Sequence, residues 1–296
     1  YEATALTVNR LCSSGLQAIV TAAMEIDNGF CDIAVAGGGE SMNNIPYYLR
    51  KARRGYRMGH AELEDGLVTA LSDPITRDHM GITAENIAER YHISREDQDA
   101  YALMSQQRAA KARDEGKFKD EIIPVEVKVS KKETKIFDTD EHIRDNTTLE
   151  KLAKLRPAFK KDGTVTAGNA SGINDCGAAV VLMKEEEAKR RGRKPVVRIV
   201  DFAAAGVDPA YMGIGPVPAV RKLLKKTGLT LDDIGLIELN EAFASQSLAC
   251  IRELGLDIEK VNVNGSGISM GHPIGATGCI ITIKLMNEMV RRQVKY

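Results

Sequence analysis

Apolar residues recur at helical spacing near the start of the chain, on the face formed by Leu16, Ile19, Val20, Ala23 and Met24. Gly29 would end this helix. The run CDIAVAGGG, which begins at Cys31, is short and almost wholly apolar, as is typical of a buried strand. Because the β-type run TALTVNR precedes the helix, the start of the chain predicts a strand, a turn, a helix and a second strand.

Strand-like and helix-like runs alternate from Ala178 onward. The predicted strands are AAVVLM, PVVRIVDFAAAG and IGLIELN. Each is followed by a predicted helix, in the order KEEEAKRR, PVPAVRKLLKKTG and EAFASQSLACIREL. Alternation of this kind favours an α/β fold with largely buried sheets.

The region between these two parts is rich in charge and has the character of an insertion. A helix is predicted to open at Ser94, with Asp97 completing a capping box, and to end before Gly116. The alternating run IIPVEVKV at 122–129 predicts a partly exposed strand. The run GTVTAGNASGIND at 163–175 marks the return to the core.

The two ends of the chain resemble each other, which indicates an internal duplication. LCSSGLQAIVTAAMEI at 11–26 and GHPIGATGCIITIKLMNEM at 271–289 are both a glycine-containing turn followed by an apolar helix. A strand follows the first copy, and the matching strand of the second would begin after Tyr296, so we expect a fold truncated at both ends. The predicted parts are an N-terminal half (1–42 and 158–194), an inserted loop domain (43–157) and a C-terminal half (195–296).

Composition excludes several classes of protein. Lys plus Arg and Asp plus Glu both number 41, so the chain lacks the basic field of a nucleic-acid binder. No apolar run reaches the length that a membrane span needs. The five cysteines are dispersed and form no Cys-x-x-Cys pair, which argues against a disulfide framework or a metal cluster and favours a reducing compartment.

Cys12 and His272 are the candidate reactive residues. Cys12 lies at the start of a predicted helix, where unpaired N–H groups lower the pKa of a thiol, although a buried packing role is the alternative. His272 is surrounded by glycines in NGSGISMGHPIGATG, a composition that suits a site more than a core. If the fold joins them, the imidazole can take the proton of the thiol.

Three other polar residues are weaker candidates. Asn240 and Glu241 begin a predicted helix, so an ordinary N-cap and a role in holding a water at an oxyanion are both open. His79 precedes another helix and could contact a ligand.

These motifs, taken together and in this order, resemble those of the thiolase family, and within it the bacterial acetyl-CoA acetyltransferases and broad-range β-ketothiolases. The resemblance spans the chain and is carried by VNRLCSSGLQAI (8–19), AGGGESM (36–42), HMGITAEN (79–86), KLRPAF (154–159), TVTAGNASGIND (164–175), MGIGPVPA (212–219), NEAFA (240–244) and NGSGISMGHPIGATG (264–278). It implies a duplicated, layered α-β-α-β-α fold with an inserted loop domain.

The resemblance also implies roles for particular residues. Cys12 would be acylated by an acyl-CoA, His272 would activate the thiol, and Asn240 would hold a water at the thioester oxyanion. His79 and Met80 would lie beside the pantetheine and acyl groups, and Arg144 would face the adenine nucleotide. The rest of the implied CoA tunnel consists of Leu155, Phe159, Ala167, Ser171, Met212, Ala242 and Phe243.

The implied partners are small molecules and further copies of the chain. Acetyl-CoA, acetoacetyl-CoA or another short 3-ketoacyl-CoA would be the substrate, with CoA as substrate or product and with no metal or other cofactor. The basic stretch RKARRGYR at 50–57 falls where related enzymes carry a tetramerisation loop, although a solvated surface or a phosphate contact is an alternative. We therefore expect a cytoplasmic homotetramer, built as a dimer of dimers.

One departure from the family pattern concerns the second half-reaction. Thiolases use another cysteine, in a Cys-x-Gly motif, to remove a proton from the second substrate. This sequence has no such motif, and its other cysteines (Cys31, Cys176, Cys250 and Cys279) lie in different contexts. We expect this polypeptide alone to be inactive in condensation and thiolysis. The alternatives are a decarboxylating ketosynthase, against which NEAFA and GHPIGATG argue, and a non-catalytic CoA-binding module.

Overall fold

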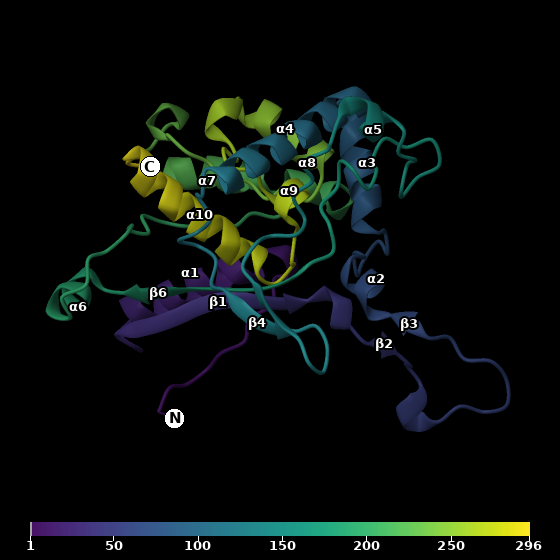
Figure 1. Ribbon diagram of the computed structural model, residues 1–296, viewed down its shortest axis with the longest axis horizontal. Coiled ribbons are helices and arrows are strands. Elements are labelled where there is room, and N and C mark those ends of the chain that lie inside the picture. The colour runs from purple at the N-terminus through teal and green to yellow at the C-terminus, as the bar shows by residue number, and fades with distance from the viewer. Residues whose placement is uncertain (1) are drawn as a thin grey trace.

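The computed structural model describes residues 2–296. Its longest strands, β1 (Ile33–Ser41) and β6 (Asp175–Met183), pair antiparallel from end to end. Figure 1 shows this pair below the main group of helices. The strands come from segments before and after the charge-rich middle of the chain, so their pairing brings the two flanks of that region together.

Helices cover one face of the β1–β6 sheet. α1 (Ser14–Asp27) and α10 (Thr277–Arg292) pack against it and against each other, with Ile19, Ala36 and Cys279 in the shared core. On the other face Val35 and Val181 stand opposite each other and are 74% and 61% exposed. The prediction of largely buried sheets is therefore wrong for this pair, because side chains alternate between the two faces and only one face has a covering layer.

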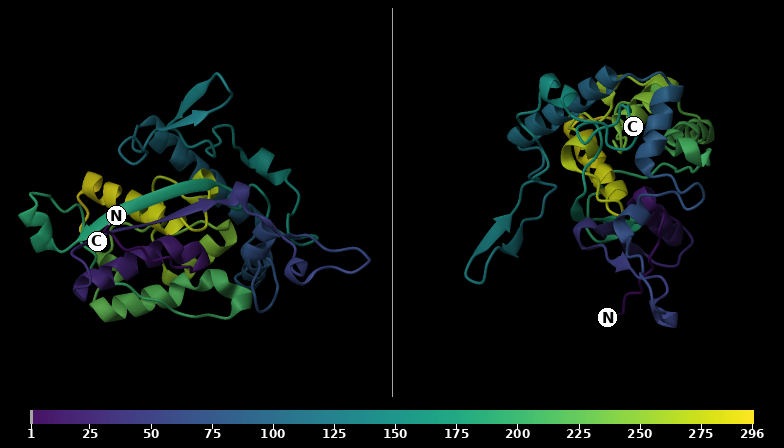
Figure 2. Two further views of the ribbon diagram at one scale, coloured as in Figure 1. Left: turned by 90° about the horizontal axis from the view of Figure 1, so that it is seen from below. Right: turned by 90° about the vertical axis from the view of Figure 1, so that its right-hand side faces the viewer.

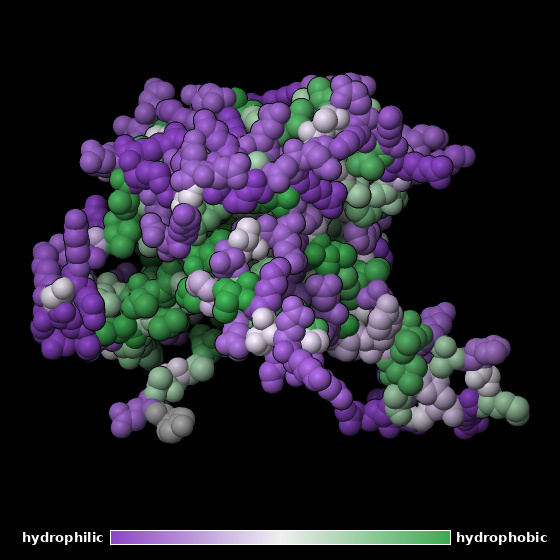
Figure 3. Space-filling model, viewed as in Figure 1, coloured by the Kyte–Doolittle hydropathy of each residue, from purple (hydrophilic) through white to green (hydrophobic). Residues whose placement is uncertain are grey.

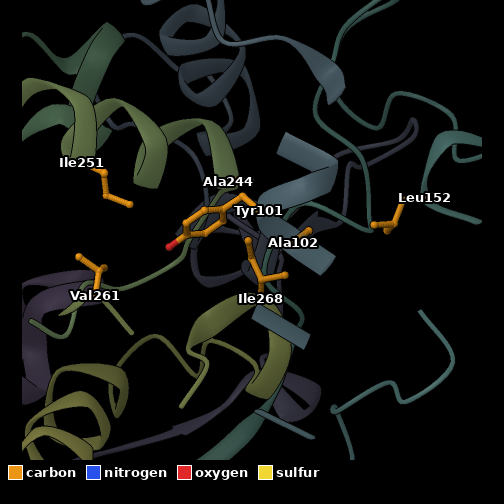
Figure 4. Packing of buried hydrophobic residues seen from close by; sticks show 7 residues of the cluster. All are labelled: Tyr101, Ala102, Leu152, Ala244, Ile251, Val261 and Ile268. Carbon is orange, nitrogen blue, oxygen red and sulfur yellow. The ribbon is translucent and has the colours of Figure 1, made fainter. Parts of the chain in front are cut away.

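A second body of helices lies above the sheet. α4 (Arg95–Asp114) packs against α8 (Ala244–Leu254) and α9 (Gly267–Met270), and α3 (Met80–Arg90) packs against α8. The core around α4, α8 and α9, drawn in Figure 4, consists of Tyr101, Ala102, Leu152, Ala244, Ile251, Val261 and Ile268. α9 leads through a short loop into α10, so this body and the sheet are joined at the segment that holds His272.

The remaining elements are short or peripheral. The helices are α2 (Gly66–Ala70), α5 (Leu149–Ala153), α6 (Glu185–Arg190) and α7 (Pro216–Thr227). The strand pairs are β2 (Tyr47–Tyr48) with β3 (Glu64–Asp65), and β4 (Val125–Lys128) with β5 (Thr134–Phe137). The 3₁₀ segments are η1 (Leu11–Ser13), η2 (Met42–Asn44), η3 (Ala52–Arg54), η4 (Pro209–Ile214), η5 (Leu231–Asp233) and η6 (Ile258–Lys260). Figure 2 shows the β4–β5 hairpin and the loop between β2 and β3 projecting from the molecule.

Capping residues place several helices where the sequence predicts them. The Ser94 side chain accepts a hydrogen bond from the Asp97 N–H at 3.0 Å, and α4 ends two residues before Gly116. α7 begins with Pro216 and ends at Thr227, and its C-cap residue Gly228 has a positive φ of 72°, the left-handed conformation that glycine adopts without strain. The predicted helices in 11–26 and 271–289 and the strands at Cys31, in 122–129 and at AAVVLM are also present.

Three predicted strands are wrong. The first, TALTVNR at 4–10, forms no strand, and its residues are mostly exposed. Residues 195–206 form no strand, and IGLIELN contributes only a single parallel bridge between Ile237 and Val261. Both runs have the apolar composition of a strand, but a strand also needs a neighbouring backbone to receive its hydrogen bonds. Within residues 2–296 neither run has such a neighbour along its length, and Val196, Ile199 and Val200 are exposed. In the same part of the chain, no helix is long and apolar enough to cross a bilayer.

Candidate active site

The loop that carries His272 is held at both of its ends. Gly271, which ends α9, has φ of 94°, and a Cβ there would lie 2.1 Å from Asn174 Oδ1. Four residues later, the Gly275 N–H donates to the Glu40 carboxylate at 3.0 Å. Because Glu40 lies near the end of β1, this bond attaches the loop directly to the sheet.

His272 is buried, and two side chains hold its ring. Its Nδ1 lies 2.6 Å from Thr277 Oγ1, and its Nε2 lies 3.3 Å from Asn240 Nδ2. Burial lowers the pKa of His272 to about 4, since the cation would lose its hydration. The ring is therefore neutral at physiological pH and able to accept a proton. Sequence reasoning missed Thr277; its signal was a hydroxyl residue five positions after a glycine-flanked histidine.

Cys12 lies in η1, directly before α1, next to a strained backbone. Leu11 has φ of 46°, a left-handed conformation that is uncommon for a residue with a Cβ. Burial raises the pKa of the Cys12 thiol to about 11; its own backbone N–H lowers that pKa and the Glu40 charge raises it. The predicted lowering by the helix start is thus wrong in direction, because loss of hydration outweighs the backbone N–H. A thiol with a raised pKa stays protonated, so it needs a base to remove its proton before the sulfur can act as a nucleophile.

The elements that carry Cys12 and His272 meet at one end of the sheet. η1 and α1 both pack against α10. A Cβ on Gly15 would lie 2.7 Å from the Cys279 backbone nitrogen, and a Cβ on Gly38 would lie 1.8 Å from the Gly275 carbonyl oxygen. Glycines at these positions therefore let the start of α1 and the end of β1 approach the loop around His272 closely.

Asn240 lies in the segment before α8 and is not its N-cap. That helix begins at Ala244 with Phe243 as the N-cap residue, so both the predicted helix start and the N-cap alternative for Asn240 are wrong. The Asn240 amide nitrogen faces His272, whereas its Oδ1 is buried and has no partner among residues 2–296. A buried amide oxygen without a partner is well suited to accept a hydrogen bond from a water or a substrate.

The neighbouring Glu241 organises the backbone around Asn240. Its fully buried carboxylate accepts hydrogen bonds from Ser105 Oγ at 2.6 Å, Asn262 Nδ2 at 3.0 Å, Tyr101 OH at 3.1 Å and the Ile268 N–H at 3.2 Å. These donors come from α4, α9 and the segment that precedes α9. Glu241 thus acts as a structural anchor that links the second body of helices to the segment that holds Asn240.

A cavity of about 140 Å³ gathers part of the implied CoA set. Arg144, Leu155 and Ala167 line it together with Lys151, and its two cations are Arg144 and Lys151. Lys151 and His142 were not predicted; a lysine two residues into a short helix carries no sequence signal of its own. The other lining residues are Gln106, Asn146, Thr147, Leu152, Gly168 and Ile268.

An aromatic group brings together three more of the predicted residues. The ring of His79 stacks on Phe159 with centroids 4.9 Å apart, and Phe159 meets Phe243 edge-on at 6.0 Å. His79 Nδ1 accepts a hydrogen bond from the Gly81 N–H at 3.0 Å, so this histidine also caps α3, whose first residue is Met80. Ala242 accepts a hydrogen bond from the Ser171 N–H at 3.0 Å.

Met212 lies in η4, which packs against α3 and α8. Within residues 2–296, neither Met212 nor Ser171 lines the cavity at Arg144. Of the predicted CoA residues, Arg144, Leu155 and Ala167 thus lie at the cavity, and His79, Phe159 and Phe243 form the aromatic group.

Models of two family domains match the chain almost from end to end. The model described as "Thiolase, N-terminal domain" matches residues 1–186, and "Thiolase, C-terminal domain" matches residues 193–296. The chain belongs to the thiolase family. The predictions of a thiolase acyltransferase and of a mixed α/β thiolase fold are therefore confirmed.

Individual thiolases resemble this chain closely. It is 56% identical over 296 residues to the beta-ketothiolase BktB of Cupriavidus necator, covering 100% of this chain and 75% of the relative. The crystal structure of the Bacillus anthracis acetyl-CoA acetyltransferase superposes with a TM-score of 0.95 at 53% identity, covering 97% of this chain and 73% of that one. The crystal structure of human mitochondrial 3-ketoacyl-CoA thiolase in complex with CoA superposes with a TM-score of 0.94 at 49% identity. This match covers 98% of this chain and 72% of the human one.

Proposed function

We propose that this thiolase chain is an acyl-CoA C-acyltransferase of the acetyl-CoA acetyltransferase type, which transfers a short acyl group through the Cys12 thiol. The observation that carries the proposal is the neutral, buried His272, hydrogen-bonded through Nε2 to Asn240 in a loop that packs against the segments around Cys12. The names of the similar enzymes support the substrate class.

The acylation step follows from these groups. The Cys12 sulfur attacks the thioester carbonyl while His272 Nε2 takes the thiol proton, so a carbon–sulfur bond forms and the carbonyl oxygen becomes an oxyanion. A water held by Asn240 Oδ1 would donate to that oxyanion, as would the protonated Nε2. The intermediate then collapses, the bond to the CoA sulfur breaks, and the departing thiolate takes the proton from His272. The products are S-acyl-Cys12 and free CoA.

The binding residues fit the chemistry of CoA. Arg144 and Lys151 at the 140 Å³ cavity would pair with phosphate groups, and the stacked His79 and Phe159 would pack against the pantetheine arm. We propose acetyl-CoA and acetoacetyl-CoA, or another short 3-ketoacyl-CoA, as the substrates. We also propose that the protein is cytoplasmic and forms a dimer of dimers. The exposed, projecting segment at 50–57 supports the proposed oligomeric state.

Mass spectrometry after incubation with acetyl-CoA tests the acylation step. We expect one acetyl group on Cys12, no adduct in Cys12→Ser, and normal labelling in the matched control Cys31→Ser. Replacing the base, in His272→Ala, should slow acetylation by about 10² to 10⁴. CoA binding without any adduct would instead support a CoA-binding module, and labelling of another cysteine would reject Cys12 as the nucleophile.

The chain as sequenced lacks a Cys-x-Gly base, and we propose that it stops after acylation. Forming the carbon–carbon bond requires removal of an α-proton from a second acyl-CoA, for which a second base is needed. Acetoacetyl-CoA thiolysis by this chain should therefore be undetectable, whereas a version extended at both ends should turn over. Robust turnover by the 296-residue chain would contradict this part of the proposal.

A further inference from the structure

Thr277 makes two hydrogen bonds beside the proposed base. It is the first residue of α10 and is 3% exposed. Its hydroxyl donates to the Pro273 carbonyl oxygen at 2.9 Å, and the same oxygen lies 2.6 Å from His272 Nδ1. A hydroxyl group has one hydrogen, and that hydrogen is directed to Pro273. Thr277 Oγ1 then presents a lone pair to the ring, which lets it accept from Nδ1–H.

The contacts on the other side of the ring agree with this assignment. With the proton on Nδ1, Nε2 is an acceptor, and it faces the Asn240 amide nitrogen, a donor, at 3.3 Å. With the Asn240 amide in this orientation, a proton on Nε2 would set two N–H donors against each other across that distance. Thr277 would then have to leave Pro273 in order to donate to Nδ1. With these orientations of the Asn240 amide and the Thr277 hydroxyl, the Nδ1–H tautomer satisfies all three contacts of this buried site.

We propose that Thr277 is a positioning residue for acyl transfer: its hydroxyl holds the His272 proton on Nδ1 and so keeps Nε2 as the basic nitrogen. The inference rests on the proposed function, because it concerns how that base is prepared. It also explains how the ring stays in place during transfer. When Nε2 takes the Cys12 proton, the Nδ1–H···Oγ1 bond remains and becomes a charge-assisted bond to the imidazolium.

Three variants separate this role from simple packing. Thr277→Val keeps the β-branched shape and removes the hydroxyl, whereas Thr277→Ser keeps the hydroxyl. Thr282→Val is the matched control, because Thr282 lies in the same helix and its hydroxyl also bonds to the carbonyl of the residue four positions earlier, at 2.8 Å to Gly278. A packing defect would lower the melting temperature of a variant, but it would not determine which ring nitrogen carries the proton.

The direct readout is ¹⁵N NMR of protein labelled at its five histidines, with the His272 signals identified by their loss in His272→Gln. Protonated and unprotonated ring nitrogens resonate in separate regions. We expect a protonated Nδ1 and a bare Nε2 in the original chain, in Thr277→Ser and in Thr282→Val, and a mixed or reversed pattern in Thr277→Val. A protonated Nε2 in the original chain would by itself overturn the inference. An unchanged pattern in a folded Thr277→Val would overturn it as well.

The functional readout is the single-turnover rate of Cys12 acetylation by acetyl-CoA. Thr277→Val should slow the step by about 10², the range of general base catalysis, with an unchanged dependence on acetyl-CoA concentration. Thr277→Ser should restore the rate, and Thr282→Val should not alter it. A normal rate in Thr277→Val would overturn the proposed role. If Cys12 is not acetylated in any form, the proposed function fails, while the NMR pattern still decides the tautomer.

Discussion

At the scale of single residues, the candidate site pairs two groups that are both neutral at rest. Burial holds the thiol of Cys12 protonated and the ring of His272 unprotonated, with pKa values of about 11 and about 4. Neither group reacts by itself under these conditions. The chemistry therefore depends on a proton moving between them as the sulfur attacks, rather than on a thiolate formed in advance.

Burial of His272 also predicts a pH dependence of stability. The pKa of this ring is about 4 in the folded chain, below its ordinary value of 6.5, so between these values the unfolded chain binds a proton that the folded chain does not. The free energy of unfolding should fall by about 3 kcal/mol as the pH falls from 6.5 to 4. Urea titrations across this range would measure the fall.

The histidine variants provide the control for this measurement. His272→Gln should lose the pH-dependent contribution, whereas His60→Gln, at an exposed position, should retain it. If the slopes of the original chain and of His272→Gln are equal, the ring is not the group responsible.

The charge of Glu40 predicts a second effect at this scale. That charge raises the pKa of Cys12, and the same carboxylate accepts the Gly275 N–H. Glu40→Gln removes the charge and keeps an acceptor oxygen, so the pKa of Cys12 should fall and its alkylation by iodoacetamide at pH 8 should become faster. Asp27→Asn, at the exposed end of α1, should leave the rate unchanged. A slower or identical rate in Glu40→Gln would show that its charge does not act on the thiol.

At the scale of elements, the site depends on the close approach of a strand, a helix and a loop. β1 supplies Glu40, η1 supplies Cys12, and the loop between α9 and α10 supplies His272. The approach of β1 to that loop is so close that a methyl group would not fit between them at Gly38.

Two neighbouring glycines test this contact. A Cβ at Gly38 would lie 1.8 Å from the Gly275 carbonyl oxygen, whereas a Cβ at Gly39 would have no atom within 4 Å. Gly38→Ala should displace the loop, lower stability by about 1 to 3 kcal/mol and slow Cys12 acetylation. Gly39→Ala should do neither. Thermal melts and acetylation rates of the two variants compare them directly, and equal behaviour would show that the loop adapts freely.

At the scale of the whole molecule, an apolar surface stands out. Figure 3 shows hydrophobic residues gathered over the region of β1 and β6. Val35 and Val181 belong to the uncovered face of the sheet, and Phe30 nearby in sequence is 85% exposed. Exposed apolar surface of this kind favours association and dye binding.

Charged substitutions on the two faces of β6 test this feature. Val181→Lys should reduce the fluorescence of a bound hydrophobic dye with little loss of stability, because this side chain is 61% exposed. Val180 points to the face packed against α1 and α10. Val180→Lys should therefore lower the free energy of unfolding by about 2 kcal/mol or more. Equal melting temperatures for the two variants would mean that the open face is covered in solution.

Much of the local structure could be predicted from the sequence. Ser94 and Gly228 mark helix ends through their own side-chain and backbone preferences, and apolar periodicity places α1, α7 and α10. These features depend on neighbours within a few residues. The predictions of strands at TALTVNR, at 195–206 and at IGLIELN were wrong because pairing depends on a partner from elsewhere in the chain, which composition does not reveal. The predicted halves and the inserted domain at 43–157 stay predictions.

The candidate site, too, was predicted in part from the sequence and decided in part by the tertiary structure. Sequence patterns determined which residues have the chemistry of a nucleophile, a base and an amide, namely Cys12, His272 and Asn240. Only the tertiary structure decided their state, because a pKa depends on the groups and the water that folding brings near or removes. It reversed the expected direction of the Cys12 pKa and revealed Thr277 beside the imidazole. Residue identity limits what a group can do, and the packing around it sets its protonation and its partners.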